Sequence, residues 1–141
     1  MLTTIRNAAL AAALGLALPA AAQQAETTGS DGEQWLQVYF ETGSSRIASD
    51  QAATLDRAAR TFREGDPFVM IVSGASDTVG DPAANLDLSI RRATAVAGAL
   101  TDRGIPIERL QVLGRGESEL EVETPEGVAE PANRVVEISW R

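Results

Sequence analysis

The chain has 141 residues, no cysteine and no histidine, and 12 basic against 20 acidic residues, a formal net charge of −8 at pH 7. This composition excludes disulfide bonds, histidine-based catalytic triads and nearly all zinc sites. It also argues against nucleic acid as a ligand, because that needs concentrated positive charge. We therefore expect a binding protein without catalytic residues, metal or cofactor.

The first 22 residues have the layout of a cleavable signal peptide. Arg6 supplies the positive start, 11 apolar residues fill 8–18, and small residues at Ala20 and Ala22 precede Gln23. An apolar stretch of this length is too short to span a bilayer. We expect cleavage after Ala22 and export to the periplasm, with outer-membrane association left open. The mature chain, with 11 basic and 20 acidic residues and a net charge of −9, is expected to have no transmembrane segment.

Residues 23–34 contain no large apolar side chain and are expected to be a flexible leader. Residues 35–141 are long enough for one domain with one hydrophobic core. The first strand is predicted at 35–40, where aromatic and β-branched residues cluster. A helix with Ser49 as its N-cap follows. Its apolar positions recur at the helical spacing of three and four residues: Ala52, Leu55, Ala59 and Phe62.

The next segment repeats this strand–helix order. Residues 68–72 are a continuous apolar run, typical of a strand covered on both faces, and 74–84 is a loop by composition. A second helix is predicted from about Asn85 to Arg103, with Gly104 ending it. Its expected buried stripe again follows the helical spacing: Leu86, Ile90, Ala93, Ala97 and Leu100.

Two short strands, predicted at 110–113 and 134–140, complete the order βαβαββ. We therefore expect an α/β two-layer sandwich, a four-stranded mixed sheet packed with two main helices on one or both of its faces. The pattern leaves open whether the last strand runs antiparallel.

The first polar cluster of interest is Ser76, Asp77 and Thr78, directly after the second strand. In open α/β sheets, ligands bind beyond the carboxyl ends of the strands, which is where Asp77 is expected to lie. The simpler alternative is that Asp77 bonds nearby amides in a turn or at the next helix start.

Two further clusters lie on the second helix and the last strand. Asn85 and Arg92 are seven residues apart, so they point about 20° from one another around the helix axis. Taken alone, such a polar stripe is more often a solvated helix flank. Asn133 and Arg134 begin the last strand, where an arginine is usually a surface residue.

Together these motifs resemble the OmpA C-terminal-like domain family. The resemblance covers residues 37–140 and is collinear in four motifs: Gly74-Ala75-Ser76-Asp77 with Gly80, Asn85-x-x-Leu88-Ser89-x-x-Arg92-Ala93, Gly114-x-Gly116-Glu117 and Asn133-Arg134-x-Val136-Glu137. It implies non-catalytic binding of peptidoglycan through the diaminopimelate of the stem peptide.

The resemblance transfers the ligand contacts to Asp77 and Arg92. The end of the ligand carries an ammonium and a carboxylate, and an Asp–Arg pair matches both charges at a fixed separation. Asn85 is expected to shape the loop or donate an amide, and Ser76 keeps the hydroxyl of the family's threonine. Arg134 is expected to support the rim of the pocket.

Two positions depart from the family pattern. The histidine of Gly-His-Thr-Asp is Ala75 here, and the second arginine of Asn-Arg-Arg is Val135. Both changes remove polar groups, which would weaken binding or favour a variant stem peptide. They also motivate the alternative function, a degenerate domain that binds other envelope proteins. A third hypothesis is a wall hydrolase that uses carboxylates such as Glu41 and Glu117.

Overall fold

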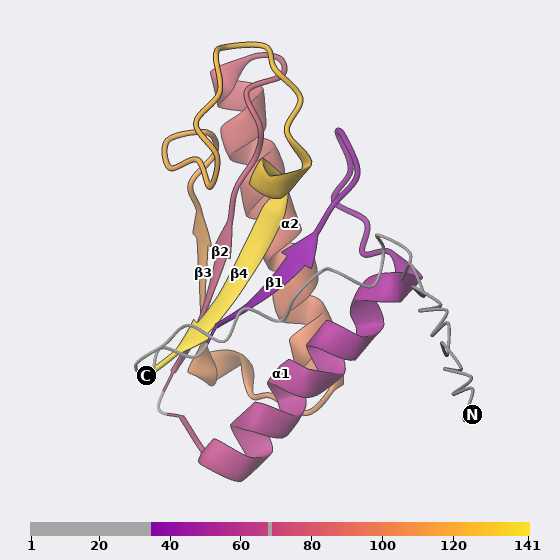
Figure 1. Cartoon of the computed structure of the whole chain (residues 1–141). Coiled ribbons are helices and arrows are strands. Elements are labelled where there is room, and N and C mark those ends of the chain that lie inside the picture. The colour runs from indigo at the N-terminus through magenta and orange to yellow at the C-terminus, as the bar shows by residue number, and fades with distance from the viewer. Residues whose placement is uncertain (1–34, 68) are drawn as a thin grey trace, which may run out of the picture.

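Strands and helices alternate along the chain and build one mixed sheet with two helices packed on it (Figure 1). The computed structural model describes residues 35–67 and 69–141, so the predicted signal peptide at 1–22 and leader at 23–34 lie outside the described residues. The main elements are β1 (Trp35–Tyr39), α1 (Ala52–Gly65), β2 (Met70–Gly74), α2 (Pro82–Asp102), β3 (Leu110–Gly114) and β4 (Val135–Trp140).

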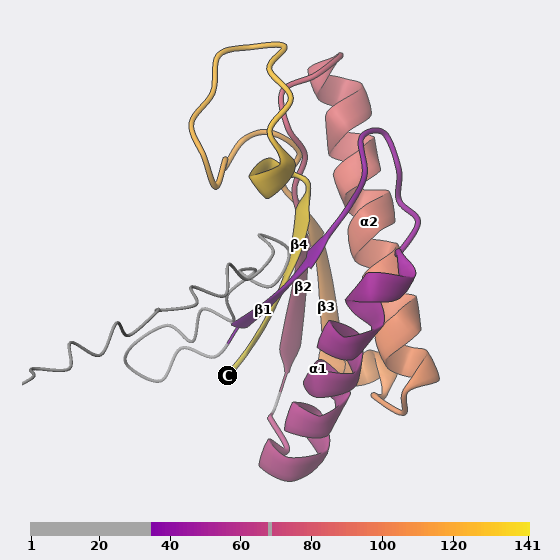
Figure 2. The same ribbon diagram turned by 45° about the vertical axis from the view of Figure 1, so that its right-hand side comes forward.

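The strands lie in the order β1-β4-β2-β3. β2 and β3 are parallel, and β4 runs antiparallel to both of its neighbours, which settles the direction that the sequence left open. The carboxyl ends of β1, β2 and β3 therefore meet at one edge of the sheet, beside the start of β4. Both helices cover the same face, as Figure 2 shows, which confirms the expected α/β two-layer sandwich.

The hydrophobic core lies between the sheet and the two helices. Each strand of the central pair and each helix contributes side chains that are at most 2% exposed: Leu55, Met70, Val72, Val96, Leu100, Val136 and Ile138. Burying a side chain of this size stabilises the fold by about 1.5–3 kcal/mol relative to exposing it. No helix among residues 35–67 and 69–141 combines the length and the apolar content that a bilayer span requires.

The buried face of α2 differs from the predicted stripe. Ala93, Ala97 and Leu100 are buried as expected, but Leu86 and Ile90 are 45% and 43% exposed. The first half of the helix turns a mainly polar set of side chains inward: Asn85, Leu88, Ser89 and Arg92. Apolar periodicity fails here because these polar groups have hydrogen-bond partners under the helix, so their burial is compensated.

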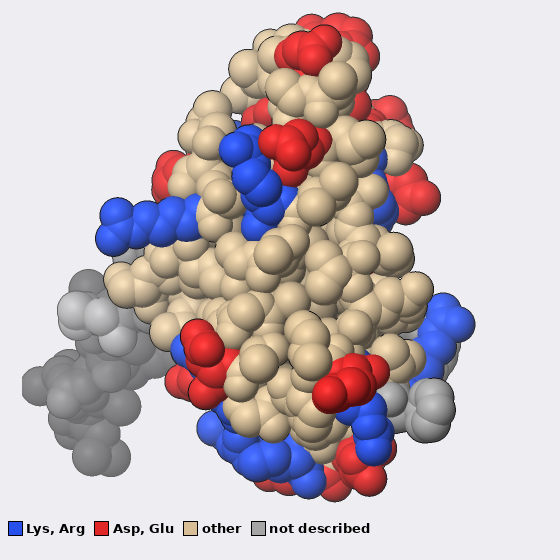
Figure 3. Space-filling view, turned by 180° about the vertical axis from the view of Figure 1, so that it is seen from behind, with Lys and Arg blue, Asp and Glu red and all other residues tan. Residues whose placement is uncertain are grey.

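The outer surface of α2 is largely uncharged. Seen from behind, the molecule has charged side chains above, below and at the sides of a broad uncharged band (Figure 3). The helix carries no charged residue between Ala93 and Thr101. Exposed Leu86 and Ile90 add to its apolar character.

Both helices begin at positions other than those predicted. Ser49 lies inside a 3-10 turn, Ser49–Gln51, and no side chain caps the start of α1. α2 begins earlier than Asn85, at Pro82. The Asp81 carboxylate accepts a hydrogen bond from the Ala84 amide at 3.2 Å. An aspartate before a proline is a strong helix start. The prediction missed it because residues 74–84 were assigned to a loop from their composition.

Candidate functional site

The residues that the sequence singled out converge where β1, β2 and β3 end and β4 begins. All five are less than one-tenth exposed: Ser76 1%, Asp77 5%, Asn85 6%, Arg92 1% and Arg134 9%. Their burial excludes a solvated helix flank for Asn85 and Arg92, because that would leave both side chains in water. The site is therefore part of the interior of the domain.

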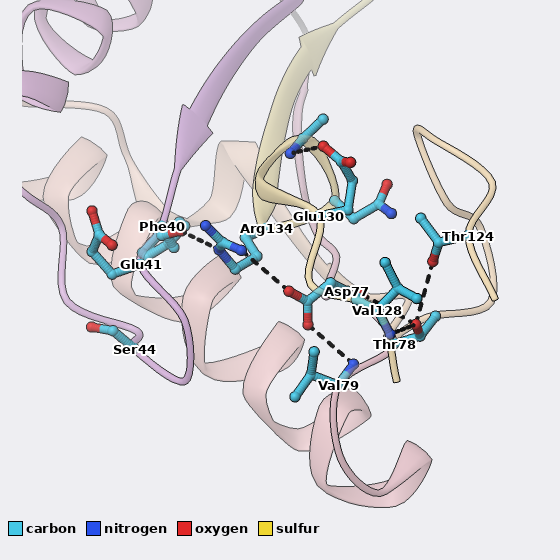
Figure 4. A network of polar contacts seen from close by, with 12 residues as sticks. Phe40, Glu41, Ser44, Asp77, Thr78, Val79, Thr124, Val128, Glu130 and Arg134 are labelled. Carbon is cyan, nitrogen blue, oxygen red and sulfur yellow. Dashed lines mark hydrogen bonds and ion pairs between the residues drawn. The ribbon is translucent and has the colours of Figure 1, made fainter. Parts of the chain in front are cut away.

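Asp77 is bound on both oxygens of its carboxylate (Figure 4). Its Oδ2 lies 3.3 Å from Nη1 of Arg134, and its Oδ1 accepts from the Val79 amide at 3.3 Å. Nε of Arg134 in turn donates to the carbonyl of Phe40 at 3.0 Å. Asp77 thus combines the local turn bond with an ion pair to Arg134, the residue before β4.

Arg92 is held by three main-chain carbonyls. Its Nε donates to Ser44 at 2.8 Å, its Nη2 to Glu41 at 3.0 Å and its Nη1 to Ala75 at 3.1 Å. The guanidinium carbon lies 5.4 Å from the centre of the Phe40 ring, a cation–π distance. Arg92 thereby joins the segment after β1 to the segment after β2.

The pKa of Arg92 is lowered to about 10: burial lowers it most, the charge of Asp77 raises it, and the charge of Arg134 lowers it. Arg92 therefore stays protonated at neutral pH. Two guanidinium groups face one carboxylate, which leaves a surplus of positive charge within a protein that is acidic overall. Such a site favours a ligand that brings a carboxylate of its own.

Asn85 and Ser76 lie between α2 and the strand ends. The Nδ2 group of Asn85 donates to the Val79 carbonyl at 2.9 Å and to Oε2 of Glu117 at 3.0 Å, so it links two loops. The amide of Ser76 donates to Gly116 at 2.8 Å. Its buried hydroxyl has no hydrogen-bond partner within the described part of the chain.

Thr78 organises the loop between β3 and β4, a role that the sequence did not reveal. Its hydroxyl donates to the Pro125 carbonyl at 2.8 Å and lies 3.3 Å from both the Thr124 hydroxyl and the Val128 amide (Figure 4). The Gly127 amide bonds to the Thr78 carbonyl at 2.9 Å. These partners lie nearly fifty positions away in the sequence, so no local pattern marks them.

Asn133 is the second structural residue that sequence reasoning left without a role. It is fully buried, and its side-chain amide donates to and accepts from the main chain of Val122, both at 2.9 Å. The side chain thus replaces a neighbouring strand as the partner of Val122. Thr78 and Asn133 together fix the loop that borders Asp77.

The two glutamates of the hydrolase hypothesis make contacts of different kinds. The Glu117 side chain accepts from Asn85, and Glu41 offers its main-chain carbonyl to Arg92. Within the described residues no group of three acidic side chains could hold a metal ion. The Glu117 carboxylate is thus part of the loop framework, whereas Glu41 contributes its main-chain carbonyl.

Comparison with known proteins gives one family. Residues 39–134 match the OmpA family. The chain is 34% identical over 108 residues to the peptidoglycan-associated lipoprotein of Rhizobium meliloti (strain 1021), which covers 75% of this chain and 60% of that protein. It is 30% identical over 100 residues to outer membrane protein A of Bordetella avium, covering 71% and 52%. The chain thus spans at most about three-fifths of the length of these curated relatives.

Solved structures share the fold. The peptidoglycan-associated lipoprotein from Burkholderia pseudomallei superposes with a TM-score of 0.69 at 22% identity, over 75% of this chain and 90% of that one. The OmpA-like domain of FopA1 from Francisella tularensis gives a TM-score of 0.64 at 19% identity, over 74% and 70%. At these identities the likeness establishes the architecture of the sheet and helices.

Proposed function

Because the chain belongs to the OmpA family, we propose that it is a non-catalytic protein of the cell envelope that binds peptidoglycan through the diaminopimelate-containing stem peptide. The observation that carries this proposal is the buried Asp77 carboxylate, which lies beside Arg134 at the edge where three strands end. The names of the relatives, peptidoglycan-associated lipoprotein above all, support the class of ligand.

The chemistry of the site suits the free end of diaminopimelate, which carries an ammonium and a carboxylate on one carbon atom. Asp77 is the acceptor for the ammonium, and the guanidinium side of the site, formed by Arg92 and Arg134, receives the carboxylate. Each charge-assisted hydrogen bond contributes about 1.5–3 kcal/mol. Asn85 and Ser76 support the walls of this site from α2 and from the end of β2.

The same proposal places the protein in the periplasm, exported by a signal peptide that is cleaved after Ala22. The outer-membrane relatives support a position near that membrane. Binding without cleavage agrees with a chain that has neither histidine nor cysteine, because the nucleophile and general-base arrangements built on those two side chains are then excluded.

Co-sedimentation of the exported protein with purified sacculi tests the proposal. Asp77→Asn keeps the size of the side chain and removes its charge, so we expect most of the protein to stay in the supernatant. Asp87→Asn is the matched control, because Asp87 is an exposed carboxylate that pairs with Arg91 on the same helix. Thermal unfolding of both variants confirms that they fold. Sedimentation of folded Asp77→Asn at the wild-type level would refute the site.

A further inference from the structure

The strand β3 has a neighbour on one side only. In the described part of the chain it pairs with β2 alone and forms the last strand of the sheet, as Figure 1 shows. The amide of Arg115, directly after the strand, donates to the Gly74 carbonyl of β2 at 2.8 Å. Successive residues of a strand direct their main-chain groups to opposite sides, so those of Leu110, Val112 and Gly114 point away from β2. The outer edge of β3 therefore offers hydrogen-bonding groups to a further strand.

The side chains of this edge strand are exposed and uncharged. Gln111, Val112 and Leu113 are all exposed, whereas no residue of β1, the strand at the opposite edge, is. Exposed edge strands usually carry a lysine, a proline or a bulge that prevents pairing with another chain. β3, with the sequence Leu-Gln-Val-Leu-Gly, has no charged residue and no proline, and its register with β2 is continuous. The strand thus lacks the usual protection.

The surface of α2 beside this edge is apolar as well. Ile90 lies against Gly114 and Leu86 against Gly116, and both side chains are nearly half exposed. With Val112 they form an apolar strip that borders the uncharged band of Figure 3. Since the chain has 20 acidic and 12 basic residues, two copies repel one another over most of their surface. At this strip they meet without that repulsion.

We propose that two copies of this protein pair through β3, antiparallel and around a twofold axis at Val112, so that two four-stranded sheets join into one. A strand that pairs antiparallel with its own copy is self-complementary, which is the requirement of a twofold interface. With the axis at Val112 all five residues of the strand are paired, whereas any other register leaves part of the strand unpaired.

The order of residues along β3 fits this register. Leu110 of one copy faces Gly114 of the second, so a large side chain lies opposite a residue that has none. Val112 exchanges two hydrogen bonds with its own copy, and the Gly114 amide reaches the Leu110 carbonyl. The amide of Leu110 is not needed, because it already donates to the Ile107 carbonyl. Side chains and main-chain groups thus favour the same register.

The charges that flank the strand are each paired within one copy. In this register Arg109 of one copy faces Arg115 of the second. Arg109 lies 3.8 Å from Asp66, and Arg115 lies 3.2 Å from Glu119. Because each guanidinium is beside a carboxylate and near water, the repulsion between the two copies is small here.

The pairing would give the assembly two separate sites. Antiparallel strands point their carboxyl ends in opposite directions, so the site at the ends of β2 and β3 in one copy lies far from that of the second. On the proposed function, one dimer would hold two stem peptides at opposite ends of the joined sheet. Two linked sites also retain a polymer such as the cell wall longer than one.

Sedimentation velocity of the exported protein over a series of concentrations tests the pairing, and we expect a monomer–dimer equilibrium. Val112→Lys places two ammonium groups face to face at the axis and should raise the dimer dissociation constant about tenfold or more. Val128→Lys is the matched control, because Val128 is 40% exposed against 36% for Val112 and lies in the loop between β3 and β4. It should leave the equilibrium unchanged. Thermal unfolding of each variant confirms that it folds. A wild-type protein that stays monomeric at every concentration, or a dimer that Val112→Lys does not weaken, would overturn the proposal.

A single introduced cysteine tests the register, because the chain has none of its own. Directly paired residues that exchange hydrogen bonds have Cα atoms about 5.5 Å apart, within the reach of a disulfide. Val112→Cys should therefore give a disulfide-linked dimer under mild oxidation. Leu113→Cys, whose two copies lie on a diagonal of roughly 7–8 Å, should cross-link much less.

The cysteine variants also decide the matter if Val112→Lys does not fold. No linked dimer from Val112→Cys, or an equal yield from Leu113→Cys, would count against the pairing. Neither measurement contains peptidoglycan, so failure of the pairing and failure of the proposed function are separate outcomes.

Discussion

The main-chain amide of Ala75 donates to the carbonyl of Val135 at 2.8 Å, so the two positions that depart from the family pattern are direct neighbours. Both are buried, Ala75 to 1% and Val135 to 0% exposure, where the end of β2 meets the start of β4. The two side chains that this protein lacks, the family's histidine at position 75 and its second arginine at position 135, would therefore lie next to one another. The wall of the site beside Asp77 is apolar there and packed closed.

Restoring the family's histidine should consequently cost stability. Ala75→His inserts an imidazole at a position that is 1% exposed, and overpacking of this kind destabilises by about 1–3 kcal/mol. Urea unfolding measures the change. Ala83→His, at an exposed alanine in the first turn of α2, should stay within about 0.5 kcal/mol of wild type. Equal effects at the two positions would contradict a closed wall at Ala75.

Arg92 and its neighbour Arg91 offer a direct comparison of a buried and an exposed arginine. Arg92→Ala removes the donor of three carbonyls and should destabilise by at least about 3 kcal/mol, because each unsatisfied acceptor costs about 1–3 kcal/mol. Arg91→Ala breaks only an exposed pair with Asp87 and should cost no more than about 0.5 kcal/mol. Chemical denaturation of both variants checks the difference, and similar values would argue that solvent satisfies the carbonyls.

The outcome for Arg92 shows where sequence reasoning ends. The resemblance placed Arg92 at the ligand, and its spacing from Asn85 gave only a direction on the helix. Its partners are main-chain carbonyls in two loops, and a carbonyl carries no sequence signal. The pair of Asp77 and Arg134 spans 57 positions and was likewise invisible, although both residues were singled out by motif.

The fold was far more predictable than the contacts of the site. The order of strands and helices follows from local apolar periodicity, which acts over a few residues. The inward face of α2 could not be predicted in the same way, because Ser89 and Asn85 are buried by virtue of hydrogen bonds that cross from other elements. Leu86 and Ile90 were predicted to be buried because they are apolar and fit the helical spacing, but both are exposed.

Close contact between β2 and α2 predicts opposite effects for two glycine-to-alanine changes. A Cβ at Gly74 would overlap the carbonyl oxygen of Ser89, so Gly74→Ala should destabilise by about 3 kcal/mol or more. Gly98 lies inside α2 with open space around it, and Gly98→Ala should stabilise by about 0.5–1 kcal/mol through its helix propensity. Thermal melting distinguishes the two signs, and a neutral Gly74→Ala would mean that the helix can move outward.

Tyr39 is the single tyrosine of the chain, so its titration can be followed directly by absorbance near 295 nm. Burial raises its pKa and the charge of Glu121 raises it further, and its hydroxyl donates to Gln37 at 2.6 Å. We expect a midpoint above the ordinary value of about 10. Glu121→Gln should lower this midpoint only in part, since burial remains.

The same shift fixes the sign of a pH effect on stability. The unfolded chain loses the Tyr39 proton first, so the folded state binds more protons once the pH exceeds about 10. The contribution of Tyr39 is therefore complete below that pH and is lost as the pH rises through the higher folded pKa. Tyr39→Phe should flatten the alkaline fall of the unfolding free energy, and an unchanged slope would contradict the titration.

The pairing of β1 with β4 has a consequence for how the protein is made. Trp35 lies opposite Ser139, and the bond between Arg134 and Phe40 closes a span of 94 positions. Contacts between such distant parts of a chain form slowly, because closing the long loop between them first costs conformational entropy. During synthesis β4 is made after the other strands, so the ion pair between Asp77 and Arg134 does not exist on an incomplete chain. On the proposed function, a chain that still lacks its last strand would therefore not bind peptidoglycan.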